Sequence, residues 1–142
     1  MTSSSAFDTG SAGEPDAEPR LLCDAGALAD APPLPDGVLW KLAESGRQLD
    51  ANVVRLAPGD RVASHREPHL DVLVLVVRGD GVLGKGSADA PEPLAEGALL
   101  WLPHGSTRSI TAGGSGLTYL TVHRRRPGIR IQSRAATAPA QP

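Results

Sequence analysis

The chain has 142 residues, of which 40% are hydrophobic and only 3% aromatic. This length predicts one domain, with a core that must be built from Leu, Val, Ala and Ile. The formal net charge of −2 gives no electrostatic reason to expect nucleic acid or an anionic membrane as a partner. Because Cys23 is the only cysteine, an intramolecular disulfide and a thiolate-rich zinc site are excluded.

Both ends of the chain are poor in residues that could be buried. Residues 1–20 are rich in Ser, Ala, Gly, Glu and Pro, which predicts a disordered leader, and residues 133–142 predict a disordered tail in the same way. The folded domain is therefore expected between residues 21 and 132. The N-terminus has neither the basic region nor the apolar run of a secretory signal, and no stretch approaches a membrane span, so we expect a soluble cytoplasmic protein.

In chain order, a short helix is expected over residues 23–28, stopped by the prolines at 32, 33 and 35. Beyond it, apolar or alternating runs separated by Gly, Pro and Asp predict strands at 38–42, 49–56, 71–77, 97–102, 107–112 and 117–123. Many short strands with close turns are typical of an antiparallel barrel or sandwich.

Two glycine-rich segments, 78–81 and 113–116, read as hairpin turns, because glycine adopts positive φ without steric cost. Pro103 cannot donate to a strand ladder, so the run 99–102 is expected to end there, at the rim of a barrel.

Two motifs resemble those of the cupin superfamily of small antiparallel β-barrels. The first cupin motif reads Gly, five residues, His, one residue, His, three or four residues, Glu, six residues, Gly. Here Gly59 and His65 match, Glu67 occupies the second histidine position and Asp71 lies near the glutamate position. The longer spacing would instead put Val72 there, and a slip of one residue turns a side chain from the lumen to the exterior.

The second motif reads Gly, five residues, Pro, one residue, Gly, two residues, His. Gly97, Pro103 and Gly105 match it without a gap, but Arg108 stands where the histidine belongs. The resemblance covers roughly residues 49–127. It implies an all-β, single-domain antiparallel β-barrel of the double-stranded β-helix, or jelly-roll, type.

The resemblance also implies a kind of site. In cupins three histidines and a glutamate bind one divalent metal, often iron, manganese, nickel or zinc, and members act as dioxygenases, isomerases, epimerases, decarboxylases or simple binders. Arg108 cannot be a ligand, because a guanidinium stays protonated and offers no lone pair. We therefore expect Arg108 to form an ion pair with Glu67 or Asp71 in the lumen, with no catalytic metal.

A metal site is kept as the alternative. His65 with Glu67 and Asp71 would supply one imidazole and two carboxylates, a mixture that suits iron or manganese. A bulge at Pro68 could instead bring His69 into the position of the missing histidine.

Two further polar residues, Tyr119 and His123, share one face of the strand 117–123. If that face lines the lumen, both could hydrogen-bond a ligand; if not, they lie on a solvated face. His104, in the turn after Pro103, is expected at the rim or in solvent.

Three functions are compatible with these residues. The first is a protein that binds a small organic ligand, for instance one with a carboxylate, without a catalytic metal, using His65, Glu67, Asp71, Arg108, Tyr119 and His123. The second is a metal-dependent dioxygenase or isomerase, and the third is a metal-free isomerase or cyclase with His65 as acid or base. Cupins commonly dimerise, so the apolar segment 38–42 is expected either to anchor a homodimer through Trp40 or to cover an edge strand of its own barrel.

Overall fold

The computed structural model describes residues 17–31, 36–87 and 89–126. Most of the predicted leader and the whole predicted tail lie outside these ranges, so their disorder stays a prediction. Residues 17–20 are described; they are exposed and have no regular secondary structure. No described helix is long and apolar enough to cross a bilayer.

The predicted helix is present as α1, Ala25–Asp30. The carboxylate of Asp24 caps its N-terminus by accepting a hydrogen bond of 3.0 Å from the backbone N–H of Ala27. Asp30, at its other end, binds the guanidinium of Arg78 at 3.0 and 3.1 Å, which attaches α1 to the sheet. The prolines at 32, 33 and 35, expected to stop the helix, lie outside the described residues.

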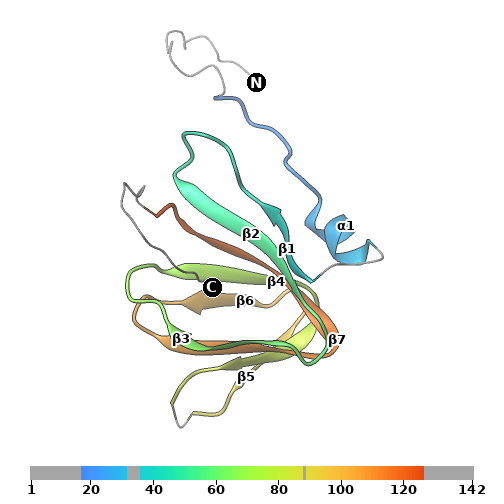
Figure 1. Ribbon diagram of the computed structural model, residues 1–142, viewed down its shortest axis with the longest axis vertical. Helices are drawn as coiled ribbons and strands as arrows, with labels where there is room; N and C mark the ends of the chain where they lie inside the picture. Colours follow the sequence, from blue (N-terminus) through green and yellow to red (C-terminus); the bar gives the residue numbers. More distant parts are fainter. Residues whose placement is uncertain (1–16, 32–35, 88, 127–142) are drawn as a thin grey trace.

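All recorded strand pairs are antiparallel, so the all-β prediction is confirmed (Figure 1). The sheet follows the order β1-β2-β7-β4-β5, with β3 paired to β7 and β6 paired to β4. Among the described residues, these strand pairs form an open sheet and do not close into a barrel. The strands are β1 (Gly37–Lys41), β2 (Leu49–Leu56), β3 (Arg61–Arg66), β4 (Val72–Gly84), β5 (Glu92–Ala95), β6 (Leu99–Leu102) and β7 (Thr107–Arg124).

The two predicted hairpin turns are wrong: both glycine-rich segments lie inside long strands, β4 and β7. Gly79 pairs with Leu117 and Gly81 with Ala112, which leaves one extra residue of β4 opposite four extra residues of β7. Gly79 has a φ of 88°, and a Cβ there would collide with the carbonyl oxygen of Gly116. The two segments therefore form one shared bend of a paired ribbon, because glycine permits both the positive φ and the close approach.

Beyond this bend, β7 leaves β3 and pairs with β2, so a single strand contributes to two parts of the structure. Its Tyr119 and Thr121 lie opposite Val76 and Val74 of β4 and are almost completely buried. The face that carries Tyr119 is therefore the inner one, which settles the alternative left open by the sequence. The apolar core is completed by residues from several strands, namely Leu70, Val72, Leu83, Leu94, Leu100, Leu102, Ile110, Ala112 and Leu117.

The segment expected either to anchor a dimer or to cover an edge strand is β1. It pairs with β2 at the end of the sheet, where Trp40 lies opposite Val53. Trp40 is half-buried. The segment thus covers the edge of its own sheet, as the second of the two expectations has it.

Candidate functional site

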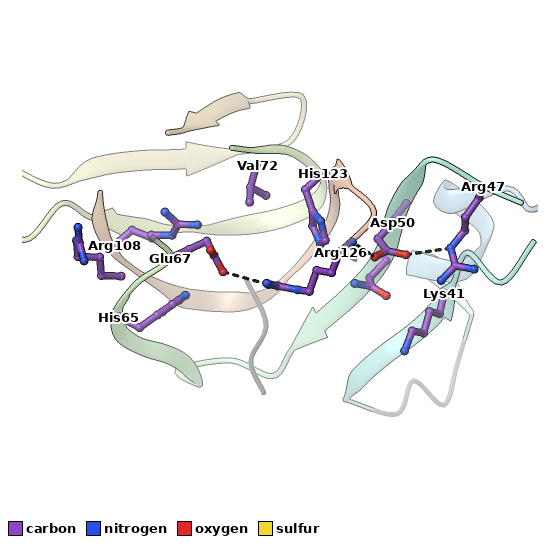
Figure 2. A pocket seen from close by; sticks show the side chains of 12 residues that line it. Lys41, Arg47, Asp50, His65, Glu67, Val72, Arg108, His123 and Arg126 are labelled. Atoms are coloured by element: carbon purple, nitrogen blue, oxygen red, sulfur yellow. Dashed lines mark hydrogen bonds and ion pairs between the residues drawn. The ribbon is translucent and has the colours of Figure 1, made fainter. Parts of the chain in front are cut away.

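A cavity of about 510 Å³ lies where β1 and β2 face β3 and β7 (Figure 2). Five cationic side chains and two carboxylates line it, so the wall carries an excess of three positive charges when its histidines are neutral. The lining residues are Lys41, Arg47, Asp50, Ala51, Asn52, His65, Arg66, Glu67, Val72, Arg108, His123 and Arg126.

Strand pairing explains why residues so distant in sequence meet here. Arg108 of β7 lies directly opposite His65 of β3, whereas His123, near the other end of β7, lies opposite Asp50 of β2. Cross-strand partners share a face of the sheet. The bend in β7 therefore turns both pairs toward one cavity.

Arg108 is the most deeply buried charge of the cavity, with 2% of its surface exposed. Its Nη1 donates to the hydroxyl of Ser106 at 3.0 Å and lies 3.3 and 3.4 Å from the carbonyl oxygens of Ser106 and Pro103. Its Nε and Nη2 have no hydrogen-bond partner among the described residues. Burial lowers the pKa of Arg108, and the nearby Glu67 carboxylate opposes that shift. A guanidinium remains charged nonetheless, so Nε and Nη2 are buried donors without an acceptor among the described residues.

Glu67 lines the same cavity but does not pair with Arg108. Its carboxylate binds Nη2 of Arg126 at 3.1 Å and accepts the backbone N–H groups of His69 and Leu70 at 2.7 and 3.2 Å. Burial alone would raise the pKa of Glu67, but the bond from His69 and the charge of Arg126 hold the pKa below its usual value. The predicted Arg108–Glu67 ion pair is wrong, because the turn after β3 directs the carboxylate to its own backbone.

Asp71 points away from the cavity, whereas its neighbour Val72 is buried and lines it. The register left open by the first motif is therefore the one that places Val72 inside. Asp71 accepts both the backbone N–H and Nδ1 of His104, at 2.9 and 2.7 Å. These two bonds lower the pKa of Asp71. The predictions that Asp71 binds the lumen ligand or pairs with Arg108 are thus wrong.

The four residues of the alternative metal site are divided between two surfaces. His65 and Glu67 line the cavity, but His69 and Asp71 surround a separate depression at the rim, together with His104 and Arg124. No bulge brings His69 inward. Among the described residues, no three side chains of His, Cys, Asp or Glu are grouped so that they could hold a metal ion. The donor set needed for the cupin metal is therefore not assembled by this chain's described side chains.

The remaining predicted ligand residues differ in their positions. Tyr119 is 1% exposed and packs in the apolar core; burial raises its pKa to about 12. It is not among the residues that line the cavity. His123 does line it, and Figure 2 shows His65 and His123 on either side of the Glu67–Arg126 ion pair.

Both histidines of the cavity have one defined tautomer when neutral. Nδ1 of His65 lies 3.0 Å from the carbonyl oxygen of Ala63, and Nδ1 of His123 lies 2.7 Å from that of Arg124. A carbonyl oxygen only accepts, so Nδ1 must carry the proton in each ring. Nε2 is then a lone-pair base that is free to accept a proton.

Sequence reasoning missed five of the charged lining residues: Lys41, Arg47, Asp50, Arg66 and Arg126. Arg126 lies just beyond the end of β7, and its partner Glu67 is 59 residues away in the sequence. Local pattern carries no signal for such a pair. Arg66 could have been suspected, since it adjoins His65 in the first motif.

The fold can be compared with solved structures. A Bacillus halodurans protein superposes with a TM-score of 0.64 at 14% identity, over 80% of this chain and 86% of that chain. The cupin domain of Schizosaccharomyces pombe Cnp3 gives 0.54 at 15% identity, over 61% of this chain and 59% of that one. The chain has a cupin fold. The resemblance seen in the two motifs is thereby confirmed at the level of fold.

A third similar structure is described as a sugar phosphate isomerase from a cupin superfamily of Silicibacter pomeroyi. This cupin gives a TM-score of 0.51 at 27% identity, over 56% of the present chain and 52% of its own. No protein-family model and no curated protein matches the sequence.

Proposed function

We propose that this cupin-fold protein binds a small organic anion, such as a carboxylate, in the cavity between β1–β2 and β3–β7, and that it does so without a catalytic metal. The observation that carries the proposal is Arg108, a buried guanidinium with two nitrogen atoms that lack a protein partner. Buried polar groups are nearly always hydrogen-bonded. A carboxylate can accept two parallel N–H bonds from a guanidinium, so it would satisfy both nitrogens together.

The charges of the cavity support the same proposal. Asp50 balances Arg47 at 2.9 Å and Glu67 balances Arg126 at 3.1 Å. The excess of positive charge therefore rests with Lys41, Arg66 and Arg108, none of which forms an ion pair with another described residue. An anion gains attraction from all three, whereas a metal cation would be repelled.

Calorimetric titration of the purified protein with benzoate, succinate and adipate, in the presence of a chelator, tests the proposal. Arg108→Met should weaken binding by about 30-fold or more, since truncating one partner of a buried charge pair costs about 2 kcal/mol or more. Arg61→Met, which removes an exposed cation of β3 outside the cavity, is the matched control and should bind as the parent does. Binding that needs an added divalent metal, or that survives Arg108→Met, would contradict the proposal.

Proton transfer is the second candidate function. The imidazole ring of His65 is held through Nδ1 by the carbonyl oxygen of Ala63, which leaves the lone pair of Nε2 available as a base. His65 lies directly opposite Arg108, the proposed anion-binding residue. A base at this position could remove a proton next to a bound carboxylate or carbonyl. Isomerisation moves protons in this way, and one cupin of similar fold is described as an isomerase. Turnover that persists with a chelator and disappears in His65→Gln, while ligand affinity is kept, would support this candidate.

The metal-dependent alternative, a dioxygenase or isomerase with iron, manganese, nickel or zinc, gains no support from the described side chains, which divide its ligands between two surfaces. Metal analysis of untagged protein and of His65→Ala tests it directly. The cytoplasmic location stays a prediction.

A further inference from the structure

We infer that the ligand of this cavity is an organic dianion with an acidic group at each end, such as a linear dicarboxylate. This inference rests on the proposed function and specifies the class of anion. It follows from where the unpaired positive charges lie within the cavity.

The inner end of the cavity holds the buried Arg108 of β7. The exposed Arg66 of β3 also lines the cavity, and its strand partner Thr107 is the neighbour of Arg108. Arg108 has the two unpartnered nitrogens described above. Arg66 donates through Nε to the carbonyl oxygen of Gly105 at 3.0 Å, which leaves its other guanidinium nitrogens without a recorded bond. One acidic group fits this end, bound by the fork of Arg108 and attracted by Arg66.

The outer end is formed by β1 and β2, where Lys41 lies opposite Asn52. Lys41 is exposed and forms no ion pair with a described residue. Its neighbour in the cavity, Arg47, is already engaged by Asp50. Figure 2 places Lys41 and Arg108 at opposite ends of the drawn cavity. A second acidic group would find its uncompensated cation here.

The region between the two ends carries no net charge. Arg126 and Glu67 neutralise one another there, beside His123 and the apolar side chain of Val72. A carbon chain suits this stretch better than a third charge does. A compact anion would reach one end only, so it would leave one cationic end unused.

The test compares each linear dicarboxylate from malonate to suberate with its own monomethyl ester, by calorimetric titration in chelator at low salt. Each pair differs by one negative charge at nearly constant size. For at least one of the longer chains, we expect the dicarboxylate to bind about tenfold more tightly than its ester, the effect of one added charged contact. Lys41→Met should reduce this ratio to near one, because the dicarboxylate loses its second charged contact whereas the ester loses only the weaker long-range attraction of Lys41.

Arg61→Met serves as the control for a lost surface cation and should keep the tenfold ratio. Equal affinity for the dicarboxylate and its monomethyl ester at every length, or an unchanged affinity ratio in Lys41→Met, would overturn the inference of a dianionic ligand. The proposed function would still stand. If neither form binds the parent protein at any length, the proposed function itself fails. Lys41 is exposed at the end of β1, so its substitution should not impair folding, which circular dichroism verifies.

Discussion

Arg108 holds a positive charge where water is nearly excluded, and the protein around it supplies only part of its hydrogen bonds. The second cupin motif ends in a histidine, and a guanidinium at that position offers no lone pair to a cation but can donate hydrogen bonds to an anion. The sequence alone shows this change of sign. It does not show what neutralises the charge, because Glu67 is captured by the backbone of its own turn and by Arg126.

The first prediction concerns the stability of Arg108→Met. An unpaired buried charge costs desolvation energy, so its removal should leave the free energy of unfolding unchanged or raise it by up to about 3 kcal/mol. Chemical denaturation in chelator measures this difference. A loss of more than about 1 kcal/mol would show that the bonds from Arg108 to Ser106 and Pro103 matter more than its desolvation.

The second prediction concerns acid. The pKa of Glu67 lies below its ordinary value of 4.5, so its ionised form contributes stability above that pH, and this contribution is lost as the pH falls through the lowered pKa. Glu67→Gln should cost about 1 kcal/mol at pH 7 and should flatten the decline in stability below about pH 4.5. Denaturation curves from pH 7 to 3 measure both effects.

Some decline in stability at acid pH should remain in Glu67→Gln, because the pKa values of Asp50 and Asp71 are lowered as well. A parent and a variant with equal pH dependence would contradict the role given to the Glu67 carboxylate.

At the scale of elements, five of the seven strands were predictable because apolar or alternating runs mark them, whereas the short β3 and β5 were missed. The prediction divided β7 in two and ended β4 at residue 77, before its second half. Glycine-rich segments permit either a reversal or a bend, and only the partner strand decides which one occurs. The segments 78–81 and 113–116 face one another across β4 and β7, and this pairing joins residues about 35 positions apart. Which residue at the start of β4 points into the cavity was likewise beyond local pattern, since the motif allows the spacing of both Asp71 and Val72.

The third prediction tests this bend. Gly79→Ala should destabilise the protein by about 2 to 4 kcal/mol, because it combines a positive φ with a collision against the carbonyl oxygen of Gly116. Gly97→Ala is the matched control: its φ of 91° is equally unfavourable, but nothing lies within 4 Å of the added methyl group. It should cost about 1 kcal/mol. Equal losses in the two variants would show that close packing at the bend contributes little.

At the scale of the whole molecule, the cupin fold could be predicted from the two motifs, whereas the cavity could not. The cavity is closed on one side by β1, β2 and the segment between them, which lie outside the motifs. Their contribution of Lys41, Arg47 and Asp50 follows from the topology alone. Residues of the motifs marked its inner end only.

The fourth prediction concerns assembly, because the resemblance to cupins makes a homodimer an expectation. Trp40 is half-buried within its own sheet, so it is a weak anchor. Two apolar side chains of β6 are more exposed than Trp40: Leu99 at 68% and Trp101 at 59%. If a homodimer forms, light scattering should show its mass to be unaffected by Trp40→Phe; dissociation of the dimer by that change would restore Trp40 as the anchor.

The most direct measurement observes the Arg108 side chain itself. Its buried Nε–H group should give a nitrogen–proton NMR signal, which is assigned by its loss in Arg108→Lys. In chelator, titration with adipate should shift this signal progressively and saturably, because the Nε–H group has no partner among the described residues and a bound carboxylate would accept from it. Movement of backbone signals elsewhere, while the Arg108 signal stays unchanged to saturation, would contradict an anion site built on Arg108.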